Sequence, residues 1–132
     1  MTIALVCTAV LALMLFLLGF NVSRMRGVRA KEGGTQLPTD PSDRLFIAIR
    51  AHGNASEYVP TLLVLFLLLG WLAPSWWSAI LIVGATASRV LHAAGMLRAR
   101  SMAAEAAPRL IGAIGTYVFG AALAVTVAIA AV

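Results

Sequence analysis

Four apolar segments, separated by short polar stretches, make up nearly the whole chain. They are Ile3 to Phe20, Leu45 to Leu72, Trp76 to Leu97 and Leu110 to Val132. At about 1.5 Å per residue, a helix over each segment can cross about 30 Å of hydrocarbon. The pattern predicts an all-α integral membrane protein, a four-transmembrane-helix bundle forming one domain over residues 1–132. We expect its helices at about 2–26, 42–72, 75–98 and 108–131.

The composition agrees with a bilayer as solvent. Of the 132 residues, 61% are hydrophobic and 11% are charged, a balance that soluble domains do not show. The longest polar connection covers residues 27–44. Its Gly33-Gly34 pair and its two prolines, Pro38 and Pro41, end helices, and Asp40 or Ser42 is expected to cap the second helix.

Among the connections between the apolar segments, positive charge gathers in the first and the third. The formal net charge is +5, and the basic side chains cluster in the first and third connections, at Arg24, Arg26, Arg29, Lys31, Arg44, Arg98, Arg100 and Arg109. Cytoplasmic loops carry such excess, so both termini are expected outside and both basic loops inside. This membrane setting argues against nucleic acid as a partner. The basic face suits anionic lipid or an anionic substrate.

A polar cluster stands at the start of the second apolar segment. At 100° per residue, Arg50, Asn54 and Glu57 fall within about 60° of arc, and Tyr58 flanks them, whereas His52 points the other way. Charged side chains are costly in hydrocarbon. This face must therefore look toward other helices or a water-filled cavity open to the cytoplasm.

The third and fourth helices add cations at a similar depth. Arg89 and His92 are one turn apart, and Arg109 begins the fourth helix. One alternative is structural, with an Arg50–Glu57 or Arg89–Glu57 ion pair that only fixes the helix register. However, one carboxylate cannot neutralise three guanidiniums, so a further anion is implied. Arginine binds carboxylates bidentately, and a zwitterion with several carboxylates fits the set.

The polar residues also carry a family resemblance. The second-helix run is Arg50-x-x-x-Asn54-x-x-Glu57-Tyr58-x-Pro60. It resembles the signature of the membrane-associated proteins in eicosanoid and glutathione metabolism (MAPEG), which include leukotriene C synthase, microsomal prostaglandin E synthase and microsomal glutathione transferases. The stretch Arg89-Val90-Leu91-His92 is similar to the matching part of helix three. The start Arg109-x-x-Gly112, followed by Thr116, is similar to helix four of bacterial members.

The resemblance implies a homotrimer in the bacterial inner membrane that binds glutathione between subunits. The residues expected to hold the tripeptide are Arg50, Asn54, Glu57, Tyr58, Arg89 and His92. Arg109 is expected to stabilise the thiolate, with Arg98 and Arg100 as alternatives. The implied activity is that of a glutathione transferase or peroxidase acting on a lipophilic electrophile.

Two other classes of protein fit parts of the pattern. A small proton-coupled multidrug exporter also has four short helices and an intramembrane glutamate, but it needs that carboxylate free to titrate. A non-catalytic membrane scaffold would need only the basic face. No metal is expected, because the chain has one cysteine, Cys7, and two separate histidines.

Overall fold

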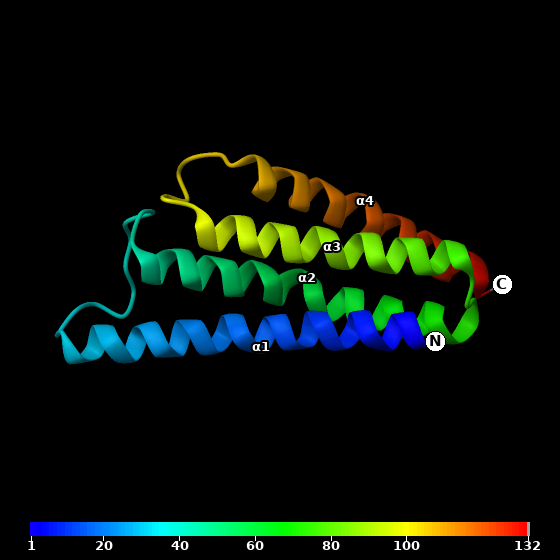
Figure 1. Ribbon diagram of the computed structural model, residues 1–132, viewed down its shortest axis with the longest axis horizontal. Coiled ribbons are helices and arrows are strands. Elements are labelled where there is room, and N and C mark those ends of the chain that lie inside the picture. The colour runs from blue at the N-terminus through cyan, green and yellow to red at the C-terminus, as the bar shows by residue number, and fades with distance from the viewer. Residues whose placement is uncertain (132) are drawn as a thin grey trace.

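The computed structural model describes residues 1–131, and its helices form an antiparallel bundle (Figure 1). The helices are α1 (Thr2–Lys31), α2 (Arg44–Leu72), α3 (Trp76–Arg98) and α4 (Ala107–Ala130). All four are long and apolar enough to cross a membrane. Both termini lie at one end of the bundle, called here the terminal end. The connections 32–43 and 99–106 lie at the opposite end, the loop end.

Helix α1 extends five residues beyond the end expected at residue 26. Its last turns contain arginine, lysine and alanine, which are good helix formers, and Arg29 and Lys31 interact favourably with the C-terminal end of the helix dipole. The helix stops where Gly33 adopts a positive φ of 68°, a conformation that glycine accepts without strain. The single Gly27 is not enough to end the helix.

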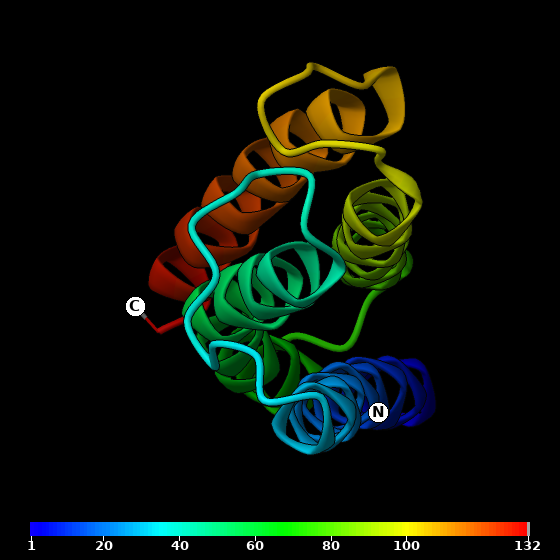
Figure 2. The same ribbon diagram turned by 90° about the vertical axis from the view of Figure 1, so that its left-hand side faces the viewer.

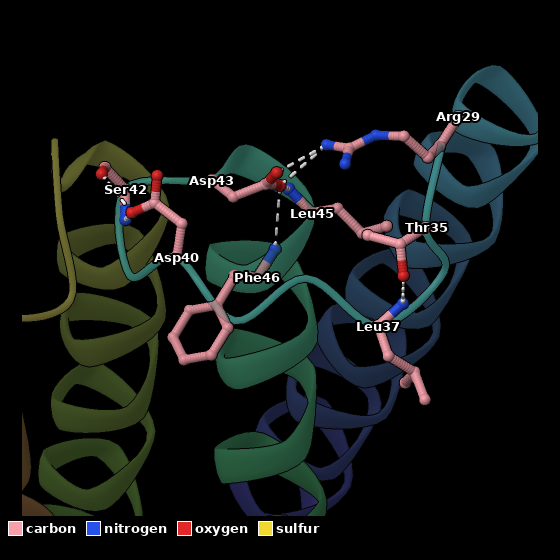
Figure 3. A network of polar contacts seen from close by, with 8 residues as sticks. All are labelled: Arg29, Thr35, Leu37, Asp40, Ser42, Asp43, Leu45 and Phe46. Carbon is pink, nitrogen blue, oxygen red and sulfur yellow. Dashed lines mark hydrogen bonds and ion pairs between the residues drawn. The ribbon is translucent and has the colours of Figure 1, made fainter. Parts of the chain in front are cut away.

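The cap of α2 is Asp43, so the expectation of Asp40 or Ser42 is wrong. The Asp43 carboxylate accepts hydrogen bonds from the backbone N–H groups of Leu45 and Phe46 (Figure 3). Asp40 instead accepts a bond from the N–H of Ser42 within the loop, at 2.8 Å. Its side chain is thus engaged in the loop itself.

The helices pack as two hairpins, with α1 against α2 and α3 closely against α4. Viewed from the loop end, α1 and α3 lie side by side, and α4 lies across α2 and α3, away from α1 (Figure 2). Glycines bring α3 and α4 together: a Cβ added to Gly112 would lie 2.6 Å from the backbone nitrogen of His92. Gly84 faces the ring of Phe119 in the same way. By contrast, Gly120 has no neighbour closer than 3.8 Å to such a Cβ.

Polar contacts tie the loop end together. Arg29 at the end of α1 forms an ion pair with Asp43, with Nη2 and Oδ2 2.7 Å apart (Figure 3). The two loops meet where the N–H of Met102 donates to the carbonyl of Pro41 at 2.8 Å. Because α2 begins beside these contacts, they help to fix the position of α2, and so of its polar residues, along the bundle axis.

Candidate functional site

The centre of the polar cluster is a contact between α2 and α3. Nη2 of Arg89 donates to Oδ1 of Asn54 at 2.8 Å and lies 3.4 Å from the Asn54 carbonyl oxygen. The guanidinium carbon of Arg89 also lies 5.2 Å from the centroid of the Tyr58 ring, within cation–π range. Three of the residues selected from the sequence are therefore in direct contact.

Arg89 is a buried cation without a carboxylate partner. Its relative exposure is 1%, and its Nε has no hydrogen-bond partner. Within residues 1–131, the ion pairs are limited to Arg29–Asp43, so neither the Arg89–Glu57 nor the Arg50–Glu57 pair considered above is formed. The contacts of the Arg89 guanidinium are with the oxygens of Asn54 and the face of Tyr58. An unpaired buried charge is costly, so this site favours an incoming negative group.

Tyr58 is also held from the side of α4. Its hydroxyl lies 3.0 Å from the hydroxyl of Tyr117, and the two rings meet edge to face with centroids 5.7 Å apart. Tyr117 was not among the residues selected from the sequence. The one available signal was its place two turns beyond Arg109 on α4, on the same side of the helix.

Arg50 and Glu57 lie on the surface of this single chain. Both are exposed, and neither makes a side-chain hydrogen bond or ion pair within residues 1–131. Glu57 is 15 residues from Leu72, about 22 Å along the helix. If Leu72 marks one boundary of about 30 Å of hydrocarbon, Glu57 lies inside the other boundary. A carboxylate at that depth requires cover from protein or water.

His92 and Arg109 form a second polar contact, between α3 and α4. Nδ1 of His92 lies 2.7 Å from the carbonyl oxygen of Arg109, an approach that Gly112 permits. The Arg109 guanidinium points to the loop, where Nη1 contacts the carbonyl and sulfur of Met102. A pocket of about 140 Å³ lies here and includes Glu105. The structure thus joins His92 to the backbone of Arg109, but it does not bring the Arg109 side chain onto the α2 cluster.

Arg109 and Tyr117, the α4 residues of these contacts, nevertheless share one side of α4. At 100° per residue, Arg109, Ala113, Tyr117 and Gly120 fall within about 80° of arc. The stripe leads from the pocket at Arg109 to an apolar groove of about 220 Å³ between α2 and α4. Tyr58 and Tyr117 line that groove and mark the change from polar to apolar surroundings. A molecule lying along this stripe would contact the pocket at Arg109, the two tyrosines and the apolar groove.

His52 belongs to a different surface. Its ring packs against α1, with Nε2 3.1 Å from a Cβ built on Gly19. This agrees with its position on the far side of α2 from Arg50. Within residues 1–131, no group of three or more His, Cys, Asp or Glu residues could hold a metal ion.

The carboxylates with perturbed acidity lie in the first loop. The Arg29 guanidinium hydrogen-bonded to Asp43 holds the pKa of that carboxyl below its ordinary value of 3.8, and the N–H groups of Leu45 and Phe46 act in the same direction. Hydrogen bonds from Ser42 likewise lower the pKa of Asp40. Both carboxylates are anionic at neutral pH.

These features define a class: a small integral membrane protein with four spanning helices and an intramembrane polar cluster on α2, α3 and α4. Comparison with protein families identifies the class more closely. The MAPEG family model matches residues 4–129, and the chain belongs to that family. A search of curated proteins finds no match.

Proposed function

We propose that the protein binds glutathione at the α2 cluster and uses its thiol against a lipophilic electrophile, as a transferase or peroxidase. Membership of the MAPEG family supports this class of activity. The observation that carries the proposal is the charge pattern of the cluster. Arg89 is buried without an ion-pair partner, and Arg50 and Glu57 are exposed and unpaired within residues 1–131, with Glu57 at membrane depth and Arg50 near the hydrocarbon boundary.

The side chains fit the groups of the tripeptide. Glutathione has two carboxylates and one ammonium. Arg50 offers a guanidinium for a carboxylate, and Glu57 offers a carboxylate for the ammonium. Asn54 and Tyr58 offer neutral hydrogen-bonding groups in fixed orientations, because Arg89 and Tyr117 hold them. His92, which contacts the Arg109 carbonyl, supports the α4 side of the site.

Arg109 is the proposed thiolate-stabilising residue. Glutathione supplies a thiol, and a nearby guanidinium lowers the pKa of a thiol and favours its nucleophilic form. Arg109 is half-buried on the α4 stripe, and within residues 1–131 its guanidinium is held only by weak contacts to Met102, at 3.4 Å and 3.8 Å. Its side chain is therefore free to turn toward the cluster. Arg98 and Arg100 are both exposed and lie beyond that stripe, so Arg109 is preferred to them.

We propose that the site is completed by neighbouring copies in a homotrimer. Glu57 is exposed in one chain at a depth where lipid would be a poor neighbour, and Arg50 is exposed on the same side of α2 near the hydrocarbon boundary. A second copy packed on this face would cover both side chains and enclose a bound tripeptide. By the positive-inside rule, the basic loop end faces the cytoplasm, so the site opens toward the compartment of a water-soluble thiol.

Calorimetric titration of the detergent-purified protein with reduced glutathione tests the binding proposal. The intact protein should bind, and Arg50→Ala should weaken binding about tenfold or more through loss of a charged hydrogen bond. Arg26→Ala is the matched control, because Arg26 is an exposed arginine on α1 whose guanidinium forms no hydrogen bond or ion pair within residues 1–131. Lack of binding by the intact protein would overturn the proposal.

Ultraviolet difference spectra test the role of Arg109. The thiolate of bound glutathione absorbs at wavelengths where the thiol does not, so the intact protein should show a thiolate band at neutral pH. Arg109→Ala should retain glutathione binding and lose the band. An unchanged band in this variant would transfer the role to Arg98 or Arg100.

A further inference from the structure

A second groove lies between α1 and α3, on the side of the bundle away from α4 (Figure 2). Its volume is about 430 Å³. Ten residues line it, and all of them except Asn21 are apolar. They are Val10, Leu13, Met14, Leu17, Leu18 and Asn21 on α1, and Val90, Ala93, Ala94 and Leu97 on α3. None of these residues belongs to the polar cluster or to the α2–α4 groove.

The groove has the depth of one membrane leaflet. From Val10 to Asn21 it follows α1 for 11 residues, about 16 Å, which is half of a hydrocarbon core of about 30 Å. Asn21 lies 19 residues from Thr2, about 28 Å from the terminal end of the helix. The groove therefore covers the half of the membrane next to the loop end. Small side chains at Ala93 and Ala94 form its floor on α3.

Two arginines lie at the membrane level just beyond the loop end of the groove. Arg24 is 22 residues from Thr2, and Arg98 is 22 residues from Trp76. At about 1.5 Å per residue, both lie about 33 Å from the terminal end, just beyond the hydrocarbon. Arg24 continues the groove side of α1 and donates to Oδ1 of Asn21 at 3.3 Å. Neither arginine forms an ion pair within the described residues 1–131.

We propose that this groove binds an anionic phospholipid of the leaflet at the loop end. One acyl chain lies along Leu13, Leu17 and Ala94, and the headgroup phosphate lies between Arg24 and Arg98. The length of the groove matches a chain that ends at the bilayer midplane. The two cations select a negative headgroup, since each basic residue near the surface attracts anionic lipid. This site does not depend on glutathione binding.

Charge and depth both favour lipid over a second copy of the chain in the groove. A spanning helix needs a contact stripe through both leaflets, whereas the groove stops near the midplane. A second copy would also place its own Arg24 and Arg98 at the same membrane level, where like charges repel. A phospholipid brings the opposite charge to the same place.

Native mass spectrometry tests the site on the whole protein. The protein is equilibrated in detergent with equal amounts of phosphatidylglycerol and phosphatidylcholine, and the retained lipids are counted. The intact protein should retain phosphatidylglycerol preferentially. The double variant Arg24→Gln/Arg98→Gln should reduce that preference on the order of tenfold. The matched control Arg26→Gln/Arg100→Gln loses the same charge; Arg26 lies about 150° around α1 from the groove centre, and the preference should change less than twofold.

A second pair of variants tests the acyl-chain position. Ala94→Leu fills the floor of the groove and should reduce retention of both lipids, whereas Ala128→Leu, an exposed position on α4, should not. Equal losses in the two arginine double variants would mean diffuse surface charge and would overturn the proposal. If Ala94→Leu changed the oligomeric mass and left lipid retention intact, the groove would be a contact between copies and the proposal would be wrong.

Discussion

Arg29 and Arg89 show two ways in which this protein holds a positive charge. Arg29 lies at the loop end and forms an ion pair with Asp43, and both side chains are partly exposed, at 26% and 18%. Arg89 lies inside the bundle, 1% exposed, and its contacts are an amide oxygen, a carbonyl oxygen and an aromatic face. The first charge is neutralised within the chain, and the second is only solvated by dipoles.

The difference between the two arginines shows which of them can contribute to the binding of an anion. An exposed ion pair contributes little, because water already screens both charges. A buried guanidinium without an anion keeps much of its electrostatic attraction for an incoming carboxylate or thiolate, since the low dielectric weakens screening. The loop-end pair therefore serves structure, and the buried arginine gives the candidate site its positive potential.

The largest expected effect comes from removing the neutral partner of Arg89. Asn54→Leu should lower the free energy of unfolding by about 3 kcal/mol, because it leaves a buried charge without its nearest oxygen. Equilibrium unfolding in mixed detergent measures this value. Val64→Ala, at an exposed position of the same helix, is the control and should have a much smaller effect.

Removal of the charge itself should cost less. Arg89→Met leaves the Asn54 side chain without a donor, and we expect a loss of about 1–2 kcal/mol. Adding Arg89→Met to Asn54→Leu should partly restore stability, because no charge is then left unpartnered. Additive losses in this double-mutant cycle would show that the two side chains are not energetically coupled.

The loop-end pair should give a smaller effect. Asp43→Ala removes both the cap of α2 and the partner of Arg29, and the unfolding temperature should fall by roughly 2–4 °C. Asp43→Asn keeps a capping oxygen and removes the charge, so its effect should be about half as large and should diminish in high salt. Thermal unfolding of both variants at low and high salt measures the two contributions. A salt-independent effect of Asp43→Asn would contradict the ion-pair account.

The smallest expected effect is the acid dependence of that pair. Arg29 lowers the pKa of Asp43 in the folded protein, so the contribution of Asp43 to stability is fully present above its ordinary pKa of 3.8. It is lost as the pH falls through the lower pKa of the folded state. The difference in unfolding temperature between the intact protein and Asp43→Asn should therefore be constant from pH 7 to pH 5 and disappear in stronger acid. A difference that persisted in strong acid would contradict this assignment.

The hydrophobic pattern predicts the helices well, because the bilayer leaves the backbone few alternatives. All four helices of the structure coincide with apolar segments. The end of α1 was less predictable, since residues 27–31 lie beyond the hydrocarbon and are decided by local helix propensity. Asp43 was missed as a cap because Asp40 and Ser42 are equally suitable by residue type. Its ion pair with Arg29 joins the end of α1 to the start of α2, a contact between two helices that residue type alone does not indicate.

The candidate site could be predicted only in part. Helical periodicity placed Arg50, Asn54, Glu57 and Tyr58 on one side of one helix. This prediction depends only on their spacing in the sequence and not on how the helices pack. The partner of each side chain depends on how the helices are rotated about their axes, which the sequence does not specify. For Arg89, the structure adds contacts with Asn54 and Tyr58 that the sequence did not predict, and its role in binding a ligand stays a prediction.

The hydrogen bond from Met102 to Pro41 has a consequence for access to the protein. It fastens the loop of one hairpin to the loop of the other, and Arg44 reaches the Ala99 carbonyl beside it, at 3.5 Å. A ligand that entered the bundle between the two loops would have to break these hydrogen bonds. In the proposed homotrimer, entry from the side, between neighbouring copies, would leave these hydrogen bonds intact, and exchange of a ligand would then depend on how the copies separate.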